Sequence, residues 1–146
     1  MPKATNINCH AAKDINKLPD NTVLISINEE YEPLYPLKLD RESENVLTLR
    51  FTDITAPLTH EGEMYHPISA EDAFKILKFI DKHLTKDFIV HCAAGVSRSS
   101  AICLYLHIMH SYVLKDNFWL SSSPNCYVLG MLMRRKVEQE SMLDEI

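Results

Sequence analysis

Short apolar runs alternate with amphipathic stretches along most of the chain. The run from Val23 to Ile27 follows the turn-forming residues 19–21 and is rich in β-branched side chains, which predicts a strand. In residues 46–51 the side chains of Leu47, Leu49 and Phe51 alternate with those of Val46, Thr48 and Arg50, which predicts a second strand with one better-buried face. The segment Phe88 to Val90 is short and wholly apolar, so we expect a strand at the centre of a sheet.

Two stretches between and after these runs have helical patterns. Ser69 and Asp72 resemble a capping box, and apolar positions then recur with a 3.6-residue period from Ala73 to Leu84. The stretch from about Arg98 to Tyr112 is apolar nearly all round, which predicts a buried helix. Because strands and helices alternate, we expect a single α/β domain over residues 1–146, with a central, mostly parallel sheet flanked by helices.

Other segments have weaker patterns. Prolines and a glycine interrupt residues 52–67, which predicts a long loop. Residues 5–9 could be an edge strand or a flexible arm. A last helix is expected near Pro124, with Ser123 as its N-cap and Pro124 at its first position. We expect Trp119 in the core or between helices, or else in a wall beside the substrate.

Composition and charge narrow the classes of partner. The chain has 15 Lys and Arg residues against 20 Asp and Glu residues, a formal charge of −5, which argues against a broad nucleic-acid-binding face. No apolar stretch is long enough to span a bilayer, and the first residues lack a secretory pattern. The four cysteines form no C-x-x-C pair, which favours free thiols in a reducing compartment. We therefore expect a cytoplasmic protein without nucleic-acid or membrane partners.

The densest cluster of reactive residues is His91-Cys92-Ala93-Ala94-Gly95-Val96-Ser97-Arg98-Ser99-Ser100. A loop that enters a helix N-terminus points several backbone N–H groups at one place, and with the helix dipole this predicts an oxyanion site. Gly95 allows the amides to turn inward, and Arg98 offers a planar fork that matches two phosphate oxygens. The same field stabilises the thiolate of Cys92, which makes it a nucleophile aimed at bound phosphorus. A buried cysteine with an unrelated surface arginine would leave the small residues between them unexplained.

This segment resembles the signature loop of the cysteine-dependent protein tyrosine phosphatases, in particular the small dual-specificity group. The Ser-Pro-Asn of residues 123–125 is similar to the start of the final core helix in that group, where the Asn braces the signature loop, and Asn125 matches it. Gly130 and Leu132 also fit the pattern, whereas Met131 stands where many members have Gln. The resemblance implies a protein tyrosine phosphatase-like fold and no cofactor.

The resemblance also implies roles for individual residues. Cys92 would attack phosphorus and form a cysteinyl-phosphate, and Ser99 would hydrogen-bond to the departing thiolate. The phosphate would bind to the loop residues Ala93, Ala94, Gly95, Val96, Ser97 and Arg98. His91 would organise the loop through the backbone rather than act as a base.

The general acid is expected on a loop upstream of the nucleophile. Asp53 follows a predicted strand and opens the long loop, so it is the best candidate for protonating the leaving group. The alternative is that Asp53 only closes the strand as an Asx turn or N-cap. Glu61 and Glu63 lie on the same loop and are rival acids.

The predicted activity is hydrolysis of phosphotyrosine, and of phosphoserine or phosphothreonine, on a phosphorylated protein or peptide, with inhibition by vanadate. The uncharged loop residues and the net acidity favour such substrates over phosphoinositides or RNA triphosphates. The alternatives are a catalytically weak phosphate-binding module, a phosphatase acting on a non-protein phosphate, or another Cys-loop enzyme such as a rhodanese or an arsenate reductase. The seven histidines lack partners at metal-ligand spacing, so no metal is expected.

Overall fold

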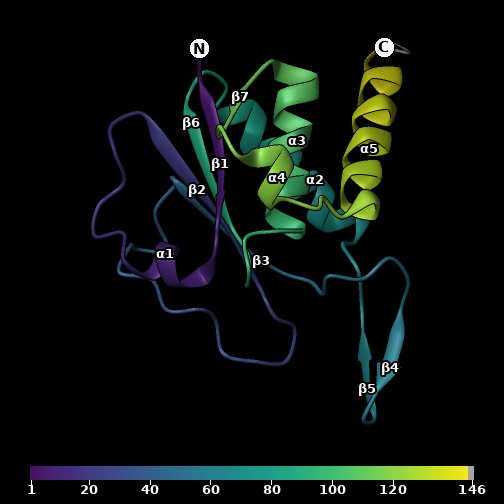
Figure 1. Cartoon of the computed structure of the whole chain (residues 1–146). Coiled ribbons are helices and arrows are strands. Elements are labelled where there is room, and N and C mark those ends of the chain that lie inside the picture. Colours follow the sequence, from purple (N-terminus) through teal and green to yellow (C-terminus); the bar gives the residue numbers. More distant parts are fainter. Residues whose placement is uncertain (145–146) are drawn as a thin grey trace.

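A five-stranded parallel sheet forms the centre of the molecule, for which a computed structural model describes residues 1–144 (Figure 1). The strand order is β3-β2-β6-β1-β7, so the predicted apolar strand, β6, lies in the middle. The sheet strands are β1 (Lys3–Ile7), β2 (Thr22–Asn28), β3 (Val46–Arg50), β6 (Asp87–His91) and β7 (Val113–Leu114). All their pairings are parallel, which confirms the predicted α/β class and sheet type.

The helices are α1 (Cys9–Lys13), α2 (Ala70–Lys82), α3 (Arg98–His110), α4 (Phe118–Ser121) and α5 (Cys126–Asp144). The long helices α2, α3 and α5 lie on one side of the sheet (Figure 1), where α2 and α3 pack against its strands and α5 packs against α2 and α3. Short α1 and irregular connections lie on the other side (Figure 1). No helix in residues 1–144 is long and apolar enough to cross a membrane, and no group of three or more His, Cys, Asp or Glu side chains there could hold a metal ion.

The predicted helical features are largely confirmed. The Ser69 hydroxyl accepts the Asp72 backbone N–H at 3.0 Å, and the Asp72 carboxylate accepts the Ser69 N–H, which completes the capping box. The first half of α3, from Arg98 to Cys103, is buried throughout, as predicted. The second half departs from the prediction, because His107 and Ile108 are exposed, Ile108 to 51%. Trp119 is an exception to the prediction, because its side chain is 66% exposed while neighbouring Phe118 fills the core position.

The N-terminal segment is an inner strand rather than an edge strand or an arm. Strand β1 pairs with β6 on one side and with β7 on the other. Its sequence, KATNI, has few β-branched or large apolar residues, so its strand character depends on these neighbours rather than on its own propensity.

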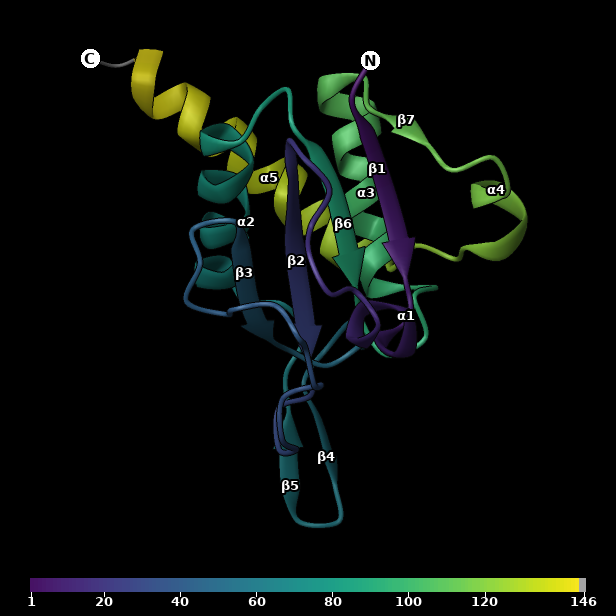
Figure 2. The same ribbon diagram turned by 90° about the vertical axis from the view of Figure 1, so that its left-hand side faces the viewer.

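The predicted long loop of residues 52–67 contains a β-hairpin, which corrects the sequence interpretation. Strands β4 (Leu58–His60) and β5 (Glu63–Tyr65) pair antiparallel, with His60 opposite Glu63. The two residues between them, Glu61 and Gly62, both have positive φ (50° and 81°), as in the type I′ turns that close two-residue hairpins. All six strand residues are partly or fully exposed, so no apolar alternation marked them, and the hairpin projects from the end of the sheet (Figure 2).

The last helix begins later than predicted. Asn125, not Ser123, caps α5, because the Asn125 side-chain oxygen accepts the N–H groups of Tyr127 and Val128 at 2.9 and 3.1 Å. Pro124 therefore lies before the helix rather than at its first position.

Gly130, within α5, offers a stability test. A Cβ added there meets no other atom within 4 Å, so Gly130→Ala gains helix propensity without a clash. We expect the free energy of unfolding to rise by about 0.5–1 kcal/mol, measured by urea denaturation with circular dichroism. A lower denaturation midpoint in the variant would contradict this expectation.

Candidate functional site

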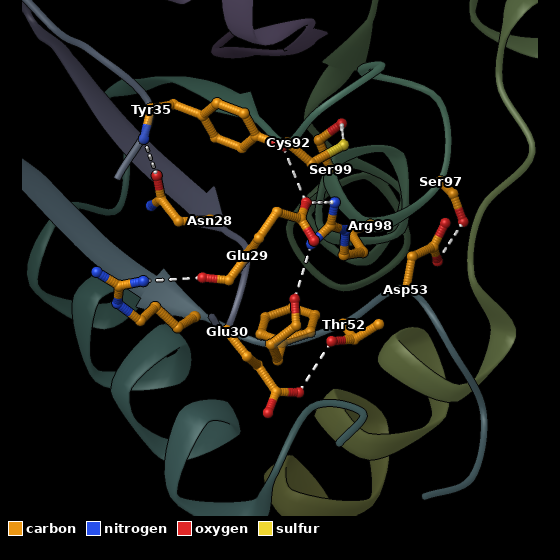
Figure 3. Close-up of polar contacts among 12 residues, drawn as sticks. Asn28, Glu29, Glu30, Tyr35, Thr52, Asp53, Cys92, Ser97, Arg98 and Ser99 are labelled. Atoms are coloured by element: carbon orange, nitrogen blue, oxygen red, sulfur yellow. Dashed lines mark hydrogen bonds and ion pairs between the residues drawn. The ribbon is translucent and has the colours of Figure 1, made fainter. Parts of the chain in front are cut away.

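The candidate site lies where three neighbouring parallel strands end. Glu29 follows β2, Asp53 comes soon after β3, and Cys92 follows β6 directly. Ligands in open α/β sheets bind beyond the carboxyl ends of the strands, so this edge is the expected place for chemistry. Residues 92–97 form the loop from β6 into α3, hereafter the anion loop, and Figure 3 shows Cys92, Arg98 and Ser99 gathered there.

The carbonyl groups of the anion loop are held from outside it. The donors are Cys9 N–H to Ala93 (3.0 Å), Asn6 Nδ2 to Gly95 (2.7 Å), Ser123 N–H to Val96 (2.9 Å) and Asn125 N–H to Ser97 (3.0 Å). By contrast, the backbone N–H groups of residues 93–97 have no acceptor within the described part of the chain. With its carbonyls turned outward, the loop leaves a set of free amide donors, the arrangement that binds oxyanions.

Gly95 makes this loop conformation possible. Its φ is +73°, and an added Cβ would lie 2.4 Å from the carbonyl carbon of Ile7 and 2.6 Å from the backbone nitrogen of Asn8. The end of β1 therefore packs directly against the loop, and no side chain fits between them.

Replacing Gly95 with Ala is expected to lower the free energy of unfolding by about 1–3 kcal/mol through this overlap, beyond the cost of the positive φ. Gly62→Ala is the matched control, because Gly62 also has a positive φ (+81°) but an added Cβ there meets no atom within 4 Å. The measurement is the difference in thermal midpoint between the two variants. Equal losses in both would show that the contact with β1 is unimportant.

Cys92 is buried at the base of the loop, with only 3% of its surface exposed. Its Sγ lies 3.2 Å from the Ser99 hydroxyl, which is fully buried in the first turn of α3. Ser99 thus provides a hydroxyl that can donate to a thiolate, as the family resemblance implied. Of the remaining cysteines, Cys103 is buried in α3, where burial raises the pKa of its thiol and keeps it neutral.

His91 is buried beside Cys92, with each ring nitrogen in one hydrogen bond. Its Nδ1 lies 3.1 Å from the Cys92 carbonyl, which can only accept, and its Nε2 lies 2.6 Å from the Ser26 hydroxyl. That hydroxyl already accepts from Arg41 and Asn28, both at 3.1 Å, so its own proton goes to Nε2. The network therefore specifies a neutral ring protonated on Nδ1, and burial with the nearby charges of Arg41 and Arg98 lowers the pKa of His91. Both ring nitrogens are therefore already in hydrogen bonds, one of them with the backbone of the anion loop.

Arg98 is clamped at one end of its guanidinium and free at the other. Its Nη1 donates to the Phe51 carbonyl at 2.7 Å, and its Nη2 donates to the Glu29 carboxylate at 2.5 Å (Figure 3). The buried Nε–H has no acceptor among the described residues. Burial opposes the charge of Arg98, but the hydrogen bond and the charge of Glu29 outweigh it and raise the pKa of the guanidinium.

Glu29 is a site residue that the sequence interpretation missed. Besides Arg98, its Oε1 accepts the Tyr35 hydroxyl at 3.0 Å, and burial together with Glu29 raises the pKa of Tyr35 to about 12. The position of Glu29 at the carboxyl end of a buried strand was the one available indication. Nothing in the local sequence connects it with an arginine 69 residues later.

The Glu29→Gln variant should loosen this clamp on Arg98. An amide oxygen can still accept from Arg98 but without the charge, and hydrogen bonds to charged groups contribute about 1.5–3 kcal/mol. We expect roughly a tenfold or greater loss of affinity for inorganic phosphate, measured by isothermal titration calorimetry. Unchanged affinity would mean that the anion loop alone orients Arg98.

Asp53 is brought to the anion loop by two hydrogen bonds. Its Oδ1 accepts from the Ser97 hydroxyl at 2.8 Å (Figure 3) and from Asn125 Nδ2, also at 2.8 Å. The Asp53 side chain is nevertheless exposed, so a substrate can reach the carboxylate. Asn125 therefore contacts the loop through its backbone and the candidate acid through its side chain.

Hydrogen bonds join the two ends of the segment from Thr52 to His66, which contains Asp53. Thr52 N–H donates to the His66 carbonyl at 2.9 Å, and one Glu30 oxygen accepts from the Thr52 hydroxyl at 2.9 Å and from His66 N–H at 2.6 Å. The rival acids Glu61 and Glu63 belong to the hairpin that projects beyond these hydrogen bonds (Figure 2). Of the three candidate acids, only Asp53 is hydrogen-bonded to the anion loop.

Comparisons with known proteins add a distant structural similarity. No protein-family model matches the chain, and no curated protein matches it significantly. A crystal structure of PTPMT1 in complex with PI(5)P is 22% identical, with a TM-score of 0.49, over 84% of this chain and 80% of that chain. The active form of Tk-PTP is 22% identical, with a TM-score of 0.40, over 94% of this chain and 81% of that chain.

Proposed function

We propose that this protein is a cysteine-dependent phosphatase of the protein tyrosine phosphatase superfamily, which hydrolyses phosphomonoesters. The observation that carries the proposal is the set of free donors in the loop that begins at Cys92. The backbone N–H groups of residues 93–97 have no acceptor among the described residues, Arg98 follows them with an unpartnered Nε–H, and the Cys92 thiol contacts Ser99. Donors placed in this way match the charge that develops on the equatorial oxygens of a phosphoryl group in transfer.

In the first step, the Cys92 thiolate attacks phosphorus, and a sulfur–phosphorus bond forms as the bond to the leaving oxygen breaks. The leaving oxygen takes the proton of Asp53 and departs as an alcohol or phenol. Asp53 is suited to this role because its exposed carboxyl is held against the anion loop by Ser97 and Asn125.

In the second step, Asp53 removes a proton from a water molecule that attacks the cysteinyl-phosphate. The sulfur–phosphorus bond breaks, inorganic phosphate is released, and the thiolate of Cys92 is restored. The Ser99 hydroxyl, 3.2 Å from the sulfur, donates a hydrogen bond to the departing thiolate and so favours this step.

The proposed substrates are phosphotyrosine, and phosphoserine or phosphothreonine, on proteins. The anion loop has no charged residue between Cys92 and Arg98, which fits a single phosphate better than a polyphosphorylated headgroup or an RNA end. A cytoplasmic location is consistent with four free cysteines.

The test is release of phosphate from an aryl phosphate by the purified protein between pH 4.5 and 8, with and without vanadate. We expect turnover that is fastest at acidic pH and is inhibited by vanadate, an oxyanion that fits the same donors. Binding of phosphate or phosphopeptide with no turnover at any pH would overturn the proposal and favour a phosphate-binding module.

A further inference from the structure

A groove of about 590 Å³ opens beside Asp53, and the two proposed reaction steps do not use it. It runs between residues 53–58 and residues 123–126, and Ser97 of the anion loop also lines it. Ile54, Pro57, Leu58 and Pro124 give it apolar walls, with hydroxyls from Thr55 and Ser123 between them. Asp53 is its only lining residue of the types Asp, Glu, Lys, Arg or His.

The position of Asp53 connects this groove with the reaction. A general acid must come within about 2.6–3.2 Å of the oxygen that it protonates, so the leaving oxygen must sit against the Asp53 carboxyl. Because Asp53 also lines the groove, the rest of the leaving group would extend from that oxygen into the groove. We propose that the groove holds the leaving group and selects phosphomonoesters whose leaving group is uncharged and partly hydrophobic. This inference rests on the proposed phosphatase function and adds a substrate class to it.

The lack of cationic side chains in the groove determines which leaving groups it accepts. A second anionic group on the leaving group would lie in the groove without a partner, because no lining residue is a Lys, Arg or His. Placing a charge against these partly apolar walls without a partner is less favourable than placing an uncharged group there, so the groove disfavours the anionic leaving group. An aromatic or aliphatic group, by contrast, gains from contact with residues such as Ile54 and Pro124.

The test uses two aryl phosphates of the same shape, 3-carbamoylphenyl phosphate and 3-carboxyphenyl phosphate, which differ by one negative charge. The measured quantity is the ratio of their kcat/KM values in the wild type and in three variants. Ala56→Lys and Thr55→Lys each add a cation to exposed positions on one wall of the groove. Ser141→Lys adds the same charge at an exposed position in the last turn of α5, outside the groove.

We expect the wild type to prefer the uncharged substrate, and each wall variant to reduce that preference roughly two- to fivefold, as for a single exposed ion pair. The reduction should disappear in 1 M salt, whereas Ser141→Lys should leave the ratio unchanged. Inhibition by inorganic phosphate, which occupies only the anion loop, checks that the wall variants keep an intact loop.

The outcomes separate the two proposals. If both substrates are hydrolysed but the wall variants move the ratio no more than Ser141→Lys does, the leaving group lies elsewhere and the groove proposal is overturned. A wild type that favours the carboxylate substrate would overturn it as well. If neither substrate is hydrolysed, the phosphatase function itself fails.

Discussion

Replacing Cys92 with Ser is expected to eliminate phosphate release from aryl phosphates, with kcat/KM falling by at least about 10⁴-fold. A serine hydroxyl is a far weaker nucleophile than a cysteine thiolate, so the anion loop holds the substrate without a competent nucleophile. The donors around the site are backbone amides and Arg98, which the substitution leaves in place. Affinity for inorganic phosphate, measured by isothermal titration calorimetry, should therefore change little while turnover is lost.

Cys103→Ala is the control for general effects of removing a thiol. Cys103 is fully buried in α3 and contributes to the core, so this variant should lose some stability but keep its activity. Turnover in Cys92→Ser within tenfold of the wild type would rule out a cysteinyl-phosphate mechanism. Equal loss of phosphate affinity and of turnover would indicate a damaged loop, and the wild-type protein would then be tested for a phosphorylated cysteine by acid quenching and mass spectrometry.

Replacing Asp53 with Asn should lower kcat/KM by about 10²–10⁴-fold for alkyl phosphates and phosphopeptides, the usual contribution of a general acid. The Asn side-chain oxygen can still accept from Ser97 and Asn125, so the fold of this segment is preserved while the proton is lost. The loss should be much smaller for an aryl phosphate with an acidic phenol, because such a leaving group departs without a proton. The measurement is the slope of log kcat/KM against leaving-group acidity, together with the pH profile, which should lose its decline at higher pH.

Glu63→Gln is the matched control, since Glu63 was a rival acid in the sequence and lies on the projecting hairpin. It should keep the leaving-group dependence of the wild type. If Glu63→Gln reproduced the steep slope expected of Asp53→Asn, and Asp53→Asn did not, the assignment of the acid would be reversed.

Much of the fold could be predicted because its evidence is local. The β-branched run of β2, the apolar run of β6, the Ser69–Asp72 capping box and the apolar surface of α3 each lie within a few consecutive residues. The inner position of β1, which the sequence left as an edge strand or an arm, and the hairpin β4–β5 were not predicted, for the opposite reason. Residues of β1 gain their strand partners from segments more than 80 positions later, and the hairpin is exposed on both faces, so neither carries a hydrophobic period.

The residues of the candidate site also fall into two groups, those that are contiguous in the sequence and those that only the fold brings together. By itself, the sequence determined the anion loop, because strand, Cys92, Gly95, Arg98 and helix are contiguous and their chemistry follows from their order. The tertiary structure alone decided what surrounds that loop. Glu29 meets Arg98, Asn6 holds the Gly95 carbonyl, and Asp53 rather than Glu61 or Glu63 reaches Ser97. These contacts join the ends of different parallel strands, and strand order is set by packing and pairing across the whole sheet, which no short stretch of residues encodes.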